Sequence, residues 1–161
     1  KGLKSYGGVR RRFEIKGIKN DIMVVDDYAH HPTEVSATLQ AARDGWDRRI
    51  IAVFQPHLYS RTKDFHKEFA AAFMNSDILI ITDIYPAREL PIKGVNGELV
   101  YNSARSIGHK NVHYVPNIEN IKECLDGLVK SNDMIITIGA GTIWRYGQAY
   151  FEHLKKLKDA S

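Results

Sequence analysis

Several features are scarce in this sequence, and each absence narrows the class of protein. Cys124 is the single cysteine, so no disulfide bond can form within the chain and a reducing cytoplasm is expected. No apolar run approaches the roughly 18–20 residues of a membrane-spanning helix. No long basic tract occurs either. We therefore expect no membrane partner and no nucleic-acid partner.

The start of the chain also lacks familiar signals. Lys1-Gly2-Leu3-Lys4 has neither an initiator methionine nor the apolar core of a secretory signal, so we expect a piece of a longer protein. The composition itself is ordinary: 161 residues, 43% hydrophobic and 26% charged, are enough for one domain with a sizeable core. The formal net charge of +4 suits an anionic small ligand at least as well as nucleic acid.

Short apolar runs alternate along the chain with segments of helical periodicity. The runs predict strands over 21–26, 49–54, 77–82, 111–115 and 133–138. The segments between them predict helices over 32–44, 62–74, 98–107, 118–129 and 142–157. An additional N-terminal strand, joined to the first run at 17–20, makes a hairpin. This order predicts an α/β fold: a Rossmann-like three-layer domain whose sheet of about six strands is mostly parallel, with one antiparallel edge strand.

Polar residues gather where the predicted strands end, in a region that we call the carboxyl edge. It comprises Asp26-Asp27-Tyr28, Gln55-Pro56-His57, Asp83-Ile84-Tyr85 and Gly139-Ala140-Gly141. Ligands of open α/β sheets bind beyond the carboxyl ends of the strands, so we expect the site here. The Gly-Ala-Gly segment has two interpretations. It either brings backbone N–H groups to an anion at a helix N-terminus or is simply a tight strand-to-helix turn.

Two dense polar stretches belong to this edge. Pro32 suits a first helical turn, which places His30 and His31 before a helix N-terminus, where positive charge is disfavoured. We expect at least one of these rings to be neutral near pH 7, unless the pair only caps and packs locally. Arg61 and Lys63 stand at the start of the next helix, against its dipole. A guanidinium there either binds a carboxylate or phosphate or is a solvated surface group.

Other functional classes stay open at this point. Zinc or manganese ligands are available in Asp26, Asp27, His30, His31, His57 and His66, and would suit a metal-dependent hydrolase. No tight ligand motif such as HExxH supports that interpretation, and we assign no metal ligand. The remaining alternative is a self-contained regulatory module that binds a nucleotide or phosphate.

Five segments together resemble a known family. RRFEIKG, VVDDYAHHPTE, VFQPHLYSRT, DIYPARELPIKGV and IGAGTIWR are similar, in order and spacing, to motifs of the carboxy-terminal domain of the Mur ligases. The resemblance starts near Gly8. It implies that residues 1–8 are a linker from a central domain and that residues 9–161 are the carboxy-terminal domain. It also implies an ATP-dependent ligation of an acid to an amino acid in cytoplasmic peptidoglycan synthesis. The members that this chain resembles most use UDP-N-acetylmuramate and L-alanine as substrates.

The same resemblance implies roles for individual residues. The ATP-binding set is Arg12 near the phosphates, Asp27 at the ribose hydroxyls and Tyr28 near the adenine. The amino-acid-binding set is His30, Arg61 and His57. Mg²⁺ and the phosphate loop are expected in the central domain, and no GxxxxGK[ST] pattern occurs in this chain. The resemblance therefore implies that this chain is inactive without its own N-terminal and central domains, and we assign no catalytic residue.

One position departs from the family pattern. Some members carry a second arginine directly after the histidine of the QPH segment, where it helps to hold the amino-acid carboxylate. This chain has Leu58 there. Either Arg61 holds the carboxylate alone or with His30, or Arg88 or Lys63 substitutes for the missing arginine.

Overall fold

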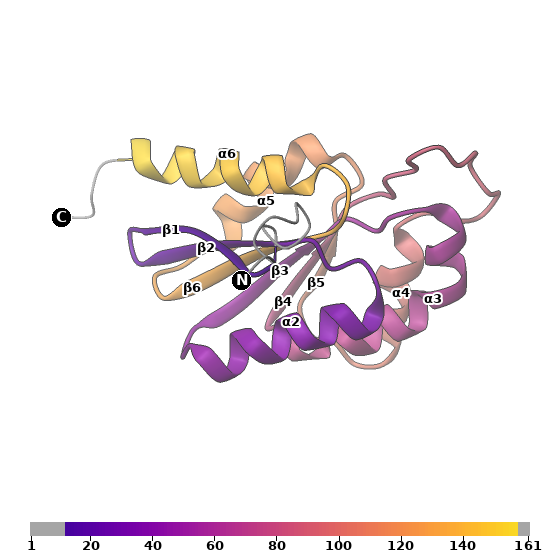
Figure 1. Cartoon of the computed structure of the whole chain (residues 1–161), viewed down its shortest axis with the longest axis horizontal. Helices are drawn as coiled ribbons and strands as arrows, with labels where there is room; N and C mark the ends of the chain where they lie inside the picture. The colour runs from indigo at the N-terminus through magenta and orange to yellow at the C-terminus, as the bar shows by residue number, and fades with distance from the viewer. Residues whose placement is uncertain (1–11, 158–161) are drawn as a thin grey trace, which may run out of the picture.

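A computed structural model describes residues 12–157, and its fold is a six-stranded sheet between two layers of helices (Figure 1). The strands, in the spatial order β1-β2-β6-β3-β4-β5, are β1 (Glu14–Lys19), β2 (Ile22–Asp27), β6 (Asp133–Ile138), β3 (Arg49–Phe54), β4 (Ile78–Ile81) and β5 (Val112–Tyr114). Only the β1–β2 pair is antiparallel among these strands. The predicted fold class is therefore confirmed.

Helices cover both faces of the sheet (Figure 1). One layer consists of α2 (Pro32–Gly45), α3 (Tyr59–Ala72), the short η2 (Phe73–Asn75) and α4 (Glu98–Ser106). The other consists of η3 (Ile118–Asn120), α5 (Ile121–Leu128) and α6 (Ile143–Lys156). Within residues 12–157 no helix has the length and apolar character needed to cross a bilayer.

The central strands are buried at nearly every position because helices cover both sides. Successive residues of β3 point to opposite faces, as pleating requires. Ile50 and Phe54 pack with the α2–α3–α4 layer. Ile51 and Val53 pack with the α5–α6 layer. This is why the strands appear in the sequence as continuous apolar runs rather than as alternating patterns.

Two predicted boundaries were wrong. The hairpin turn lies at Asn20-Asp21, whose φ values of 54° and 61° fit the tight turns that suit strand twist, and not at 17–20. Gly17 lies inside β1 beside a bulge, and a Cβ there would come within 2.4 Å of the Phe151 ring on α6. The second predicted helix begins at Tyr59, three residues earlier than expected.

The parallel register brings four strand ends together at the carboxyl edge. Ile138 at the end of β6 is in register with Asp27 of β2 on one side and with Phe54 of β3 on the other. Phe54 is in turn paired with Ile81 of β4. Consequently the segments that follow these strands emerge side by side, as the sequence predicts.

Candidate functional site

Asp27, the last residue of β2, organises one end of the carboxyl edge. Its side chain is only 6% exposed and accepts hydrogen bonds from the N–H groups of Phe13 and Ala29, each at 2.8 Å. Burial raises the pKa of the Asp27 carboxyl, and this effect outweighs the opposing influence of the two N–H donors and of Arg12. The neighbouring acid, Asp26, instead accepts from Thr137 on β6 at 2.7 Å, which makes it part of the core.

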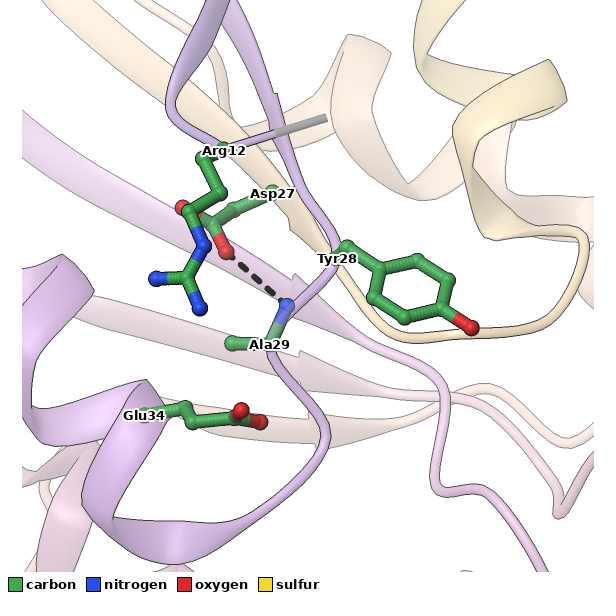
Figure 2. A pocket seen from close by; sticks show the side chains of 5 residues that line it. All are labelled: Arg12, Asp27, Tyr28, Ala29 and Glu34. Carbon is green, nitrogen blue, oxygen red and sulfur yellow. Dashed lines mark hydrogen bonds between the residues drawn. The ribbon is translucent and has the colours of Figure 1, made fainter. Parts of the chain in front are cut away.

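A small pocket opens beside Asp27 (Figure 2). It has a volume of about 20 Å³ and is lined by Arg12, Asp27, Tyr28, Ala29 and Glu34. In Figure 2 the Arg12 guanidinium lies on the Asp27 and Glu34 side, whereas the Tyr28 ring points in the opposite direction. The three residues predicted to bind ATP therefore lie together around one pocket.

A wider groove of about 340 Å³ continues from this pocket along α2. The two share Arg12, Asp27 and Glu34, and the groove adds the small side chains of Ala37 and Ala41. The combined surface is therefore polar at the strand end and less polar along the helix, which is the usual character of a site for a small organic ligand.

The two adjacent histidines are held by the start of α2. One carboxylate oxygen of Glu34 accepts from the N–H groups of His30, at 2.9 Å, and His31, at 3.1 Å. His30 Nδ1 lies 3.0 Å from the carbonyl oxygen of Tyr28. Since a carbonyl only accepts, that nitrogen carries a proton. Desolvation, followed by the nearby Arg61 and His30, lowers the pKa of His31, in line with the expected neutral ring.

The amino-acid-binding set meets at the other end of the edge. Arg61 lies in the first turn of α3, and its Nη1 donates to His57 Nδ1 at 3.1 Å. Desolvation, with Arg61 and His30 as further causes, lowers the pKa of His57 and keeps the ring neutral. The His30 and His57 ring centroids are 6.1 Å apart. The structure thus brings His30, His57 and Arg61 into one cluster, as predicted.

Two contacts at this end are not predicted from the sequence. Tyr85 stacks on His57, with ring centroids 5.7 Å apart and planes inclined by 14°. Glu89 accepts hydrogen bonds from both the N–H and the hydroxyl of Ser60, at the beginning of α3. No local pattern pairs Ser60 with Glu89, because the contact joins two loops that only the fold brings together.

Leu58 adopts an unusual backbone conformation at the same place. Its φ of 76° and ψ of 136° are rarely adopted by residues with a side chain. Its N–H donates to the Tyr85 carbonyl at 2.9 Å, and its carbonyl accepts from the Thr62 N–H at 3.2 Å. Such strain persists where the surroundings impose it and concentrates at functional sites. The strain at Leu58 therefore agrees with a site at this edge.

The Gly139-Ala140-Gly141 turn is closed by a side chain. Gln55 Oε1 accepts from the N–H groups of Thr142, at 2.8 Å, and Ile143, at 3.1 Å, at the start of α6. A Cβ on Gly141 would lie 2.6 Å from both Gln55 Oε1 and Tyr85 Cγ. The glycine is thus needed for close packing, and the N–H groups of Thr142 and Ile143 are already used. Of the two interpretations, these contacts favour the tight turn.

The six candidate metal ligands do not converge. Asp26 is bonded to Thr137, and His66 on α3 lies 2.8 Å from the hydroxyl of Ser103 on α4. Across residues 12–157 no three His, Cys, Asp or Glu side chains form a group that suits a metal ion. Nothing in the described chain therefore favours the metal-dependent hydrolase.

Residues 11–141 match the family model described as Mur ligase, glutamate ligase domain, and the chain belongs to this family. It is 53% identical over 154 residues to the UDP-N-acetylmuramate–L-alanine ligase of Geotalea uraniireducens, an alignment that covers 96% of this chain and 34% of that protein. The ligase of the same name from Salinibacter ruber is 52% identical over 155 residues, covering 96% of this chain and 33% of that protein. This chain thus spans about a third of the length of these relatives.

The fold is also that of a solved relative. The crystal structure of the UDP-N-acetylmuramate–alanine ligase of Thermotoga maritima superposes with a TM-score of 0.76 and 27% identity, covering 92% of this chain and 30% of that one. The family resemblance stated from the five segments is therefore confirmed. The individual residue roles that it implies stay predictions.

Proposed function

We propose that this chain is the carboxy-terminal domain of a UDP-N-acetylmuramate–L-alanine ligase, which contacts both ATP and the amino acid. The observation that carries this proposal is the arrangement of the carboxyl edge. A pocket around Asp27 and a His30–His57–Arg61 cluster lie on one sheet edge, as suits two substrates that act in successive steps on the same carboxylate. The names of the relatives supply the substrates UDP-N-acetylmuramate and L-alanine.

The proposed reaction joins a carboxylate to an amine in the cytoplasmic synthesis of peptidoglycan precursors. ATP transfers its γ-phosphoryl group to the lactyl carboxylate of UDP-N-acetylmuramate, which gives an acyl phosphate and ADP. The uncharged amine of L-alanine then attacks the acyl carbon, and the tetrahedral intermediate expels inorganic phosphate as the amide forms. Mg²⁺ would neutralise charge on the transferring phosphoryl group. It is proposed to bind mainly to the central domain, together with the phosphate loop.

The nucleotide end would use the pocket beside Asp27. A carboxylate has about four acceptor positions. Asp27 uses two of them on the N–H groups of Phe13 and Ala29, and the Thr38 side chain is a third hydrogen-bond partner. The position that is left would accept from a ribose hydroxyl. Arg12 on the pocket wall would then meet a phosphate, and the 37% exposed ring of Tyr28 would lie near the adenine.

The amino-acid end would use Arg61 and its two histidines. Among the described residues, the Arg61 guanidinium has one hydrogen-bond partner, His57 Nδ1. The other donors of its planar fork match a carboxylate in two-pronged geometry. His30 has Nδ1 occupied by the Tyr28 carbonyl, so Nε2 is the ring nitrogen that would meet the amino group of alanine. Because Leu58 replaces a family arginine, we propose Arg61 as the main cation for the carboxylate.

Alanine kinetics on the full-length ligase that contains this chain test the proposal. Arg61→Ala should reduce kcat/KM for alanine by roughly two orders of magnitude or more, since it removes a partly desolvated ion pair. Formation of the acyl phosphate should continue, because it precedes entry of the amine. Lys67→Ala removes an exposed cation from a later turn of the same helix and is the matched control. Equal alanine kinetics in both variants would refute the proposed role of this edge.

A further inference from the structure

The backbone of Tyr85 is hydrogen-bonded to the residues on both sides of His57. Its N–H donates to the carbonyl of Pro56 at 2.8 Å, and its carbonyl accepts from the N–H of Leu58 at 2.9 Å. These are the residues directly before and after His57, so the two loops are joined on both sides of the histidine. The strained φ of Leu58 lies within the same connection. Tyr85 therefore fixes the backbone from which the His57 ring projects.

The Tyr85 side chain adds a second restraint. Its ring is nearly parallel to that of His57, and the ring centroids are 5.7 Å apart. Gly141 packs against the same side chain, and a Cβ there would lie 2.6 Å from Tyr85 Cγ and 2.9 Å from Tyr85 Cβ. Gln55 holds the Gly141 turn in place through the N–H groups at the start of α6. The ring thus contacts both His57 and the Gly141 turn, which restrict its movement.

We infer that Tyr85 is a positioning residue, which holds the His57 ring so that His57 Nδ1 takes one N–H of Arg61 and aligns the rest of the guanidinium for the substrate carboxylate. This inference rests on the proposed function, in which Arg61 binds the amino acid. It assigns to the β4–α4 loop and the Gly141 turn a role in amino-acid affinity, although neither contributes a group that touches the carboxylate.

The expected effect on alanine affinity depends on the conformational freedom of the Arg61 side chain. A long side chain on a helix surface loses considerable rotamer entropy when a ligand fixes it. The His57 contact removes part of that cost before alanine arrives, but only while the imidazole plane stays in place. Without the Tyr85 ring, His57 is free to rotate, and the two-pronged geometry that Arg61 offers is lost.

The test uses the full-length ligase with variants at Tyr85. Tyr85→Leu should raise KM for alanine about tenfold, which corresponds to the interaction free energy of one aromatic pair. The kcat and the KM for ATP should be nearly unchanged. Tyr85→Phe keeps the ring and should retain the wild-type alanine KM. Gly141→Ala should act like Tyr85→Leu, because its methyl group displaces the ring. Gly127→Ala on α5, where a Cβ meets nothing within 4 Å, is the matched control for this change.

A double-mutant cycle with Arg61 shows whether Tyr85 acts through it. Once Arg61→Ala is present, adding Tyr85→Leu should not weaken alanine use further, since nothing remains to be aligned. Additive effects, or a wild-type alanine KM in Tyr85→Leu, would overturn the inference. If Arg61→Ala itself leaves alanine use unchanged, the proposed function has failed instead. Should Tyr85→Leu not fold, the cycle with Gly141→Ala gives the same decision.

Discussion

An acid and an arginine occur at both ends of the parallel strands, but they have different roles at the two ends. At the amino edge, where the parallel strands begin, Asp133 at the start of β6 is 1% exposed. It accepts from Arg49 at the start of β3, from Nε at 2.9 Å and from Nη2 at 2.8 Å. It also accepts from the N–H of Lys130 at 2.7 Å. The hydrogen bonds to the Asp133 side chain, followed by the charges of Asp133 and Asp77, raise the pKa of Arg49. Acid and arginine satisfy each other here, and little capacity is left for a ligand.

At the carboxyl edge Asp27 and Arg61 do not satisfy each other. Asp27 accepts from two backbone N–H groups, with Arg12 on the same pocket wall, and Arg61 donates to a neutral histidine. The ion pairs found within residues 12–157 include neither Asp27 nor Arg61. The contrast teaches that pairing, rather than residue type, separates structural from ligand-binding groups. The predictions below challenge this contrast, from the largest expected effect to the smallest.

The largest effect should be loss of stability at the amino edge. Asp133→Ala leaves Arg49 and the Lys130 N–H without their shared acceptor. Breaking such a pair should cost about 3 kcal/mol of unfolding free energy, the lower end for buried pairs, because the Arg49 side chain is 33% exposed. Urea unfolding of the chain measures it. A loss as small as that of the exposed Asp44→Ala would show that the amino edge is not structural.

Arg61→Lys should be nearly as harmful to alanine use as Arg61→Ala. Lysine keeps the charge but lacks the planar fork, and it cannot bond both His57 and a carboxylate in the same fixed geometry. We expect kcat/KM for alanine to fall by roughly a hundredfold in the full-length ligase. Near-normal alanine kinetics in Arg61→Lys would move the carboxylate clamp elsewhere. Arg88, exposed on the β4–α4 loop, would then be the next residue to test.

Asp27→Ala should mainly weaken the use of ATP. Loss of an acceptor for ribose hydroxyls should cost on the order of 2–3 kcal/mol, or roughly 30- to 150-fold in kcat/KM for ATP. Asp27→Asn keeps a side-chain oxygen that accepts from one of the two N–H groups. Comparing it with Asp27→Ala therefore separates the effect on the loop from the effect on the ligand contact. If both variants retain wild-type ATP kinetics, Asp27 only organises the loop between β2 and α2.

The smallest effect should be a dependence of stability on pH. Burial is the first cause of the lowered pKa of His31, His57, His109 and His113. As the pH falls below about 6.5, the unfolded chain takes up protons that the folded chain does not, so the unfolding free energy decreases. Asp27, whose pKa is raised, acts in the opposite direction. Urea unfolding between pH 7.5 and 5.5 measures the slope, which His109→Gln should reduce. An unchanged slope would contradict this explanation.

The strands and helices were predictable because their signals are local. A buried strand such as β3 is a continuous apolar run, and α2 begins at a proline. The start of α3 was not predictable in the same way. Its N-cap is Leu58, a poor cap, and the acceptor for the Ser60 N–H is Glu89 from a distant loop. The hairpin turn was misplaced because Gly17 looks like a turn residue, although it is required by the Phe151 ring.

The grouping of the candidate residues was predictable from the sequence, but the contacts among them were not. The rule for open α/β sheets placed these residues at the carboxyl edge, and the order of the strands made His30, His57 and Arg61 neighbours. The sequence could not show that Gln55 fills the Gly141 turn, or that Tyr85 stacks on His57. Both contacts join loops that follow different strands, so they depend on sheet register and not on any short pattern.

One measurement on two arginines tests the central claim most directly. Arg61→Ala and Arg49→Ala are compared in the full-length ligase, for alanine kinetics and for unfolding free energy. Arg61→Ala should lose alanine use and keep its stability, whereas Arg49→Ala should lose stability, because Asp133 is left buried and unpaired, and keep the alanine KM of its folded fraction. An Arg61→Ala variant with normal alanine kinetics, or an Arg49→Ala variant with a raised alanine KM, would contradict the division between a structural and a ligand-binding edge.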